Sequence, residues 1–183
     1  MAITANLTDS CAAISGGIRR IAFISKSDVA EGAITLHTGG EVGSITLATG
    51  KEFFEYDAEQ DTIEWRENGE MVNGSLKYTE EIELYIRGNN PVNRNAIVEL
   101  VEDLCGVLAI AQDSNGTIFL IGWSDDLDLD RPLKMASDAS GSGKELTDLA
   151  GSTITMTCMS PEKARSIRTA DTSITWSSLT TPA

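Results

Sequence analysis

The chain contains few of the residues on which most catalytic and metal sites depend. It has a single histidine, His37, and an odd number of cysteines, Cys11, Cys105 and Cys158, with no C-x-x-C pair. A structural zinc site takes four Cys or His ligands at short spacings, and no such set is present. His37 stands beside Gly39-Gly40, a turn sequence, and no serine lies in a nucleophile-elbow motif. We therefore expect no metal, no cofactor and no enzymatic activity, and we expect Cys105 and Cys158 to be small buried residues.

Long apolar runs and an excess of basic residues are also absent. No stretch of about eighteen apolar residues occurs, so the sequence predicts no membrane-spanning helix. The opening residues Met1–Asn6 do not join a basic region to an apolar one, as a secretory signal would. Fourteen basic residues stand against twenty-eight acidic ones, and the net charge of −14 argues against binding of nucleic acid by charge attraction. The excess of acid fits plain solubility as well as a surface that faces nucleic acid without holding it.

Two short motifs resemble ligand sites but fail on their spacing. Gly141–Glu145 (GSGKE) contains a Gly-Lys pair, but Asp138 stands where a phosphate loop has its first glycine, and Glu145 replaces the hydroxyl residue. Asp125–Asp130 is rich in acids, yet an EF-hand loop that began at Asp125 would place Asp130 at the invariant glycine. We expect this run to form a solvated strand edge. A hydrolase with a carboxylate site stays open as an alternative, although the sequence does not locate such a site.

The clearest pattern is a long strand followed by a helix. Ser75–Gly88 alternates apolar and polar residues with period two, which is typical of a half-buried antiparallel strand. Asn90 can cap the helix that follows, Pro91–Leu104, and Gly106 ends it. The helix has one apolar stripe, so we expect it to pack on a sheet. The stripe consists of Ile97, Leu100, Val101 and Leu104.

Shorter strands fill much of the remaining chain and give the expected domain plan. They are predicted at Ile18–Ile24, Ala33–Leu36, Val42–Ala48, Lys51–Asp57, Val107–Gln112, Thr117–Trp123, Ser152–Ser160 and Ser173–Trp176, with a mobile connection at Ala136–Gly143. Thr49-Gly50 is expected to be a hairpin turn. The plan has an N-terminal arm at 1–17, a domain at 18–160 and a polar C-terminal segment at 161–183. The fold class is mainly β (α+β), an antiparallel β-sandwich or small barrel with one flanking amphipathic helix.

One long acidic connection, residues 58–74, is expected to project from this domain. Its two halves are predicted to pair across Asn68-Gly69, as a hairpin that exposes Ile63, Trp65 and Met71. Apolar residues on a projecting hairpin suggest a partner that covers them. A loop folded back on its own sheet is the alternative.

Several segments match a known family in their order and residue types. They are Cys11 with Gly16–Ile21, Ile45–Tyr56, Tyr78–Leu84, Asn93–Ile97, Gln112–Gly116 and Leu146–Gly151. Together they cover roughly residues 11–160 and resemble tail tube proteins of tailed bacteriophages and prophages, particularly from phages of Bacteroidetes-type hosts. The resemblance implies a non-enzymatic virion structural protein. Such a protein assembles in the host cytoplasm into hexameric rings, and the rings stack as a tube through which DNA passes.

The resemblance also implies roles for particular residues. The projecting hairpin would reach onto the neighbouring subunit through its three apolar residues. An acidic lumen would let DNA slide without specific binding, with Glu80, Glu81 and Glu83 as candidate lumen-facing acids, together with Asp125–Asp130. The implied partners are further copies of this chain and other tail proteins, with no membrane. A neck or ring component of the virion is the alternative within this class.

A carbohydrate-binding β-sandwich is an alternative from a different class of function. The chain has three tryptophans, Trp65, Trp123 and Trp176, which could stack on sugar rings. This interpretation requires their ring faces to be exposed. Their burial therefore distinguishes it from a structural role.

Overall fold

The computed structural model describes residues 16–56, 61–88, 90–142, 150–170 and 174–181. Several predicted features lie wholly or partly outside these residues, among them the N-terminal arm up to residue 15 with Cys11, the start of the connection at 58–60, and Gly143, Lys144 and Glu145 of the GSGKE motif. The elements are β1 Ile18–Ser25, a 3-10 turn at Lys26–Asp28, β2 Val29–Leu36, β3 Val42–Leu47, β4 Phe54–Tyr56, β5 Ile63–Val72, β6 Ser75–Arg87, α1 Pro91–Glu102, β7 Val107–Asp113, β8 Ile118–Ile121, β9 Lys134–Gly141, β10 Gly151–Ser160, β11 Arg165–Ser166 and α2 Trp176–Leu179.

The fold is mainly β, as predicted, with antiparallel sheets and one flanking helix. The five-stranded sheet has the order β11-β8-β7-β1-β4, and the four-stranded sheet has the order β5-β6-β10-β9. β2 and β3 form a separate two-stranded ribbon. Among the described residues these sheets do not close into a barrel.

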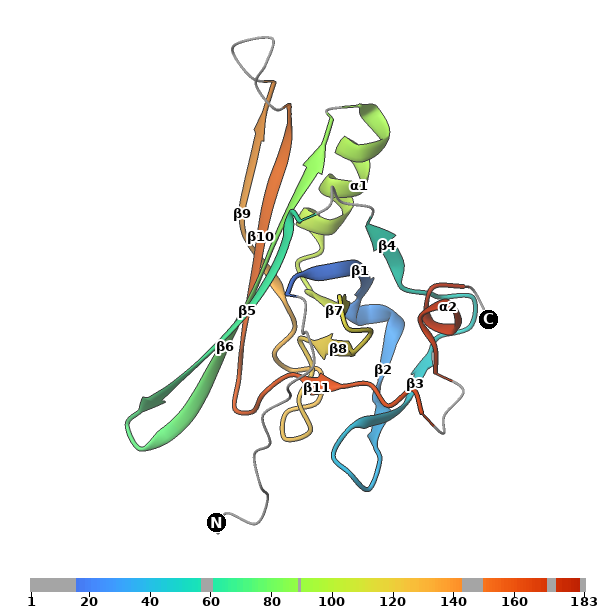
Figure 1. Cartoon of the computed structure of the whole chain (residues 1–183), viewed down its shortest axis with the longest axis vertical. Helices are drawn as coiled ribbons and strands as arrows, with labels where there is room; N and C mark the ends of the chain where they lie inside the picture. Colours follow the sequence, from blue (N-terminus) through green and yellow to red (C-terminus); the bar gives the residue numbers. More distant parts are fainter. Residues whose placement is uncertain (1–15, 57–60, 89, 143–149, 171–173, 182–183) are drawn as a thin grey trace.

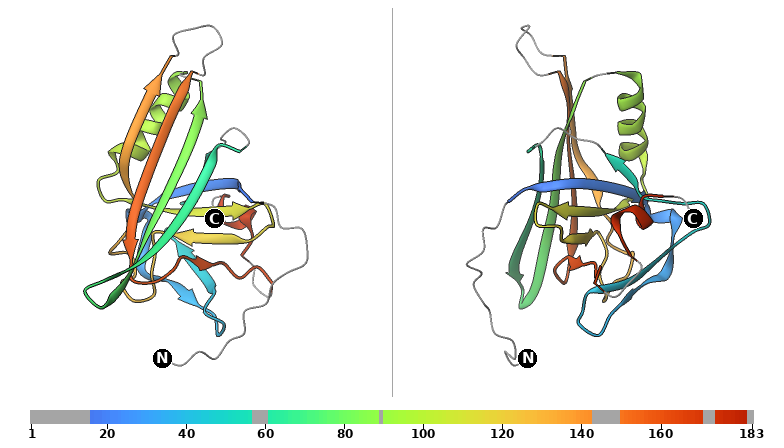
Figure 2. Two further views of the ribbon diagram at one scale, coloured as in Figure 1. Left: turned by 60° about the vertical axis from the view of Figure 1, so that its left-hand side comes forward. Right: turned by 45° about the vertical axis from the view of Figure 1, so that its right-hand side comes forward.

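The five-stranded sheet lies in the middle of the molecule and is apolar on both faces. In β1, Ile21 and Phe23 belong to the core cluster shared with the four-stranded sheet and α1, whereas Ala22 and Ile24 belong to a second cluster. That second cluster contains residues of β2, β3 and α2. Successive residues of a strand point to opposite faces, so an unbroken apolar run such as that of β1 is buried on both sides. Figures 1 and 2 show the resulting layers, with the long four-stranded sheet on one side and the β2–β3 ribbon and α2 on the other.

The helix forms where the sequence predicts it, but it ends earlier. Asn90 caps α1 by accepting a hydrogen bond from the Asn93 backbone N–H to Oδ1 at 2.8 Å. Ile97 and Leu100 are buried in the first cluster. Leu104 lies two residues past the last helical residue, Glu102, and is 86% exposed, so its place in the predicted stripe is wrong. No helix in the part of the chain that the structure describes is long and apolar enough to cross a bilayer.

The predicted hairpin across Thr49-Gly50 is wrong. β3 pairs with β2, and β4 pairs with β1 at the edge of the five-stranded sheet. Between them, Phe53 is buried in the second cluster, and its backbone N–H donates to the carbonyl oxygen of Leu179 at 2.9 Å. This contact with the C-terminal residues directs the chain away from β3.

The acidic run Asp125–Asp130 forms turns and not a solvated strand edge. Asp128 adopts φ +48°, and its carboxylate accepts hydrogen bonds from Trp123 Nε1 and the Gly32 backbone N–H, both at 2.8 Å. Leu129 is buried in the second cluster. These local contacts override the alternating pattern, because a turn satisfies the Asp128 carboxylate and still buries Leu129.

Two further segments near the C-terminal end differ from their predictions. The predicted mobile connection at Ala136–Gly143 is mostly strand β9, which pairs with β10 along most of its length. Its Ser, Ala and Gly residues are weak strand formers, and pairing with β10 determines their conformation instead. In place of the predicted strand at Ser173–Trp176 the chain forms the short helix α2, and Ser173 lies outside the described residues.

The folded body extends past the predicted boundary at residue 160. Ile167, Ile174, Trp176 and Leu179 are all buried in the second cluster. β11 pairs with β8 and so adds the C-terminal segment to the five-stranded sheet. Spaced apolar residues in a polar segment are therefore part of the core here.

Candidate functional site

The projecting hairpin exists, but its turn lies five residues later than predicted. β5 runs without interruption through Asn68-Gly69, and the chain turns at Asn73-Gly74, between the paired residues Val72 and Ser75. Asn73 and Gly74 have φ +50° and +82°, the two positive values that a two-residue type I′ turn requires. Both Asn-Gly pairs suit such a turn. The later one lets β5 pair with β6 along its whole length.

One face of this hairpin starts in the core and ends in solvent. Its paired residues from the core outward are Ile63 with Leu84, Trp65 with Ile82, Glu67 with Glu80, Gly69 with Tyr78, and Met71 with Leu76. Ile63 is buried, and Trp65 is half-buried against Phe119 with ring centroids 4.8 Å apart. Met71 and Leu76 are 70% and 46% exposed. The predicted exposure is therefore wrong for Ile63 and Trp65, which face the central sheet, and right for Met71, because the hairpin extends beyond the sheet that covers its base (Figure 1).

The other face of β5 and β6 is acidic. Glu81 and Glu83 are half-exposed there, and Arg66 lies between them, with its Nη2 3.0 Å from Glu81 Oε1 and 3.3 Å from Glu83 Oε2. Glu64 is a third carboxylate beside Arg66, at 3.5 Å. Three acids thus share one base, and the threonines of β10 continue this polar face.

Glu80 points the opposite way and is completely buried, so its predicted place on a lumen surface is wrong. Along β6 it alternates with Glu81 and therefore shares the core face with Ile82. Its Oε2 accepts hydrogen bonds from the Gly122 backbone N–H at 3.3 Å and from Cys158 Sγ at 3.4 Å. Its Oε1 is buried without a hydrogen-bond partner among the described residues.

Burial changes the acid–base behaviour of Glu80 and Cys158. Desolvation, with smaller contributions from the charges of Glu67 and Glu162, raises the pKa of Glu80 to about 7, although the hydrogen bonds from Cys158 and Gly122 oppose the change. Burial and the neighbouring Glu80 also raise the pKa of the Cys158 thiol. Cys158 is therefore an inert buried thiol, as predicted, whereas Cys105 is exposed and its predicted burial is wrong.

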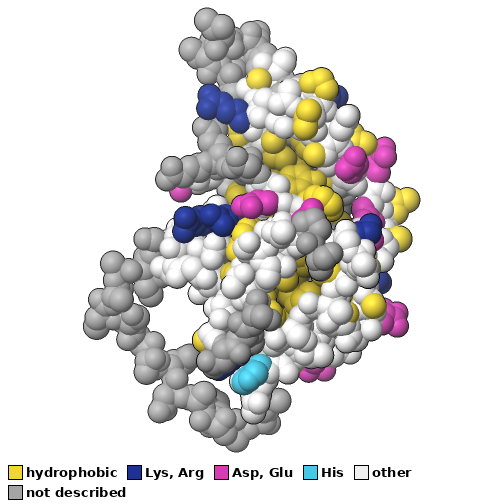
Figure 3. Space-filling view, turned by 90° about the vertical axis from the view of Figure 1, so that its right-hand side faces the viewer, with side chains coloured by type: hydrophobic (Ala, Val, Ile, Leu, Met, Phe, Trp, Pro, Cys, Tyr) yellow, Lys and Arg dark blue, Asp and Glu magenta, His cyan; other side chains and the backbone are white. Residues whose placement is uncertain are grey.

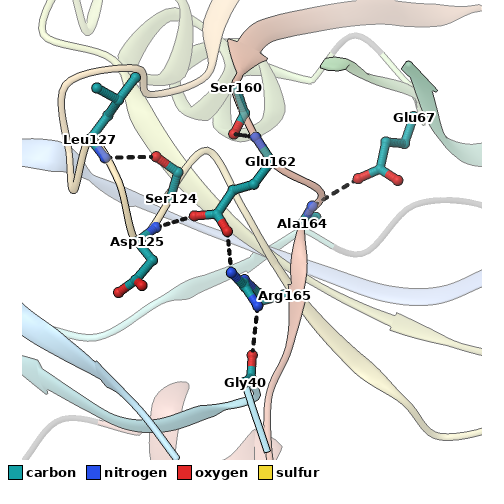
Figure 4. A network of polar contacts seen from close by, with 9 residues as sticks. All are labelled: Gly40, Glu67, Ser124, Asp125, Leu127, Ser160, Glu162, Ala164 and Arg165. Carbon is teal, nitrogen blue, oxygen red and sulfur yellow. Dashed lines mark hydrogen bonds and ion pairs between the residues drawn. The ribbon is translucent and has the colours of Figure 1, made fainter. Parts of the chain in front are cut away.

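A segment after β10 crosses from the four-stranded to the five-stranded sheet beside these residues. We call this segment, Pro161–Ser166, the strap. Glu67 Oε1 accepts the Ala164 backbone N–H at 2.7 Å, and Glu162 binds the Asp125 backbone N–H and the Arg165 guanidinium (Figure 4). Arg165 also donates to the Gly40 carbonyl oxygen at 3.2 Å, which ties the strap to the β2–β3 turn.

A groove of about 510 Å³ opens between α1 and the strands β1 and β4. Its apolar lining includes Phe23, Leu100 and Phe54, and Phe54 is 59% exposed. Four acids also line it: Asp28, Glu55, Glu99 and Asp103. Figure 3 shows apolar side chains gathered in the middle of this side of the molecule, with acidic side chains beside and around them.

Tyr56 closes one side of this groove. Its hydroxyl donates to the Ala96 carbonyl oxygen of α1 at 3.0 Å. Burial, with a smaller contribution from the charge of Glu99, raises the pKa of Tyr56 to about 12. The hydroxyl therefore stays protonated and links β4 to the helix.

The arrangement of the tryptophans does not favour sugar stacking. Trp123 and Trp176 are buried, and their indole N–H groups donate to Asp128 and Glu55. Trp65 is half-buried. Among the described residues no group of three or more His, Cys, Asp or Glu side chains could hold a metal ion. His37 is exposed beside the β2–β3 turn, as the sequence predicts.

No protein-family model, no curated protein and no solved structure matches this chain. A function for this chain therefore has to be argued from its own sequence and structure. Sequence reasoning found the hairpin and Met71, but it missed Leu76 as an exposed partner of Met71 and Glu80 as a buried acid. The signal for Glu80 was present: the residue has the same parity as Ile82 and Leu84 on an alternating strand.

Proposed function

We propose that this chain is a virion structural protein of a bacteriophage tail tube, in which copies assemble as hexameric rings that stack around a DNA passage. The observation that carries the proposal is the uncovered end of the β5–β6 hairpin. Met71 and Leu76 lie side by side on a projecting element, and they are 70% and 46% exposed. Exposed apolar residues grouped in this way are typical of a contact between proteins.

The apolar groove beside α1 is a suitable acceptor for the hairpin end of a neighbouring copy. The two surfaces occur at separate places on the molecule, and so each copy can use both at once (Figures 1 and 3). A contact between two different surfaces of identical chains is heterologous, and it generates a ring when the rotation closes. Phe54, exposed at the groove, and Met71, exposed at the hairpin, are the residues that we assign to this contact.

The acidic face of β5 and β6 is the candidate wall of the passage. Glu81 and Glu83 are accessible there, and the shared Arg66 leaves the group with a net negative charge. A wall of the same sign as DNA has no attraction that would hold each phosphate, so the polyanion slides past it. A neutral or positive potential calculated for the inner surface of the assembled ring would contradict this role. Other tail proteins are the further partners in this proposal, and the virion is the site of action.

The contact can be tested with two variants that each remove one of the two surfaces. The double variant Met71→Ser with Leu76→Ser removes the apolar side chains of the hairpin end. The variant Phe54→Ser removes an exposed apolar side chain of the groove. Each variant alone should fail to assemble. A mixture of the two should form dimers and nothing larger, because only one intact hairpin–groove pair is available to each pair of chains.

The control is Val92→Ser, which removes a 76% exposed apolar residue of α1 that does not line the groove. This variant should assemble as the unchanged chain does. Masses measured by light scattering distinguish the outcomes. Normal assembly of the hairpin variant would contradict the assigned contact.

A further inference from the structure

Glu80 joins the two large sheets at the place where the strap crosses between them. It belongs to β6 of the four-stranded sheet, and it accepts a hydrogen bond from Gly122, which follows β8 of the five-stranded sheet. The strap begins directly after β10 and ends in β11, which pairs with β8. The buried carboxyl group and the strap therefore connect the same two layers.

Two other carboxylates near Glu80 hold the strap itself. Glu67 is the cross-strand partner of Glu80 on β5, and it accepts the backbone N–H of Ala164 in the strap. Glu162 is a strap residue that binds the Asp125 backbone and Arg165. Like charges directly opposite each other on paired strands are destabilising, so an ionised Glu80 would repel the group that binds the strap.

The neighbouring cations do not neutralise Glu80. Lys163 lies 3.5 Å from Glu67 and is largely exposed, and Arg165 pairs with Glu162. On the third side, β10 contributes only the neutral thiol of Cys158. Glu80 is 0% exposed and its Oε1 has no hydrogen-bond partner among the described residues. The charge of an ionised carboxylate in this position would not be balanced by a cation. Its burial would therefore cost far more free energy than the burial of a protonated carboxyl group.

We propose that Glu80, Glu67 and Glu162 form a proton-controlled latch, in which the proton on Glu80 holds the strap and the two sheets together. Loss of this proton places a third negative charge beside Glu67 and Glu162. The strap then loosens at the contact of Ala164 with Glu67 and at the contact of Glu162 with Asp125. The device is internal to one chain and does not depend on self-assembly.

The direction in which pH changes the stability of the latch follows from the shift in the pKa of Glu80. Its pKa rises from the ordinary 4.5 to about 7 in the closed structure. Between these values the closed state binds a proton that the open state releases, so opening becomes easier as pH rises. The stabilisation is complete below about pH 4.5, falls through the window up to about pH 7, and then stays low.

Amide hydrogen exchange of the strap tests the latch in the full-length protein. After correction for intrinsic exchange, protection of the strap amides should fall by up to about tenfold for each pH unit from pH 5.5 to about 7, and then level off. In Glu80→Gln, which keeps the polar shape and cannot ionise, the strap should stay protected at every pH. Glu81→Gln is the control, because Glu81 lies on the opposite face of the same strand, and it should follow the unchanged protein.

Three results would overturn the latch: a flat profile in the unchanged protein, the same pH dependence in Glu80→Gln, or an unprotected strap in Glu80→Gln at every pH. A second measurement needs no folded Glu80→Gln protein. With ¹³C-labelled glutamate, one carboxyl carbon of the unchanged protein should titrate near neutral pH. Its midpoint should rise in Cys158→Ala, because the hydrogen bond from the thiol favours the charged form. Titration of every glutamate below about pH 5.5 would also overturn the proposal.

Discussion

The alternation of side chains along a strand decides which residues of this chain are buried, and it applies to acidic residues as it does to apolar ones. Glu80 is buried because its position alternates with the solvent-facing Glu81 and Glu83, although all three are glutamates. Burial then determines its chemistry, since desolvation, more than the charges of Glu67 and Glu162, raises its pKa. Glutamates an odd number of positions apart on one strand can therefore line a surface or join two sheets.

The buried stripe of α1 gives the first prediction at this scale. Leu100→Ala should lower the free energy of unfolding by about 2–5 kcal/mol, because the truncated side chain leaves a cavity in the cluster between α1 and the sheets. Urea unfolding followed by circular dichroism measures the loss. Leu104→Ala is the matched control. Since Leu104 is 86% exposed, its truncation should change stability by less than about 0.5 kcal/mol.

At the scale of elements, the sequence predicted those parts whose pattern is local. The long strand β6, the start of α1 and the strand β10 have regular periodicity or caps, and the structure confirms them. Pairing partners were not predictable in the same way. β3 pairs backward with β2, and β4 pairs with β1, because contacts with distant residues such as Leu179 decide the path between them.

Two Asn-Gly pairs in the β5–β6 segment show the same limit for the candidate site. Either pair could form the turn, and only pairing along the whole hairpin selects Asn73-Gly74. That choice moves the turn by five residues, which returns Ile63 and Trp65 to the core and leaves Met71 and Leu76 at the projecting end. The local sequence therefore predicts that an apolar hairpin projects from the domain. It identifies only some of the exposed apolar residues, because these depend on where the turn lies.

The connection from α1 to β7 gives a prediction for this scale. Gly106 and Gly116 have nearly equal φ values, +91° and +92°, but a Cβ on Gly106 would lie 2.6 Å from Pro132 Cγ, whereas one on Gly116 would meet nothing within 4 Å. Gly116→Ala should cost about 1–3 kcal/mol through backbone strain alone. Gly106→Ala should cost about 1–3 kcal/mol more, because Pro132 and Leu133 must shift. Equal thermal stabilities of the two variants would show that the close contact is absent.

At the scale of the whole molecule, the chain combines a strongly negative net charge with exposed apolar side chains at the hairpin end and at the groove beside α1. A net charge of −14 keeps copies apart at long range. The hairpin end and the groove beside α1 are attractive only at contact, where apolar side chains leave water. Such a combination suits a protein that is soluble as single chains and associates through a few defined surfaces.

The mass and shape of the purified protein test the proposed assembly most directly. Light scattering combined with negative-stain microscopy should show closed rings or stacked tubes with a central hole, and a mass that is a multiple of the single-chain value of 19.6 kDa. The account predicts that these particles disappear in the variant that carries Met71→Ser and Leu76→Ser. A compact monomer of 19.6 kDa at every concentration, with no ring in the images, would contradict the account.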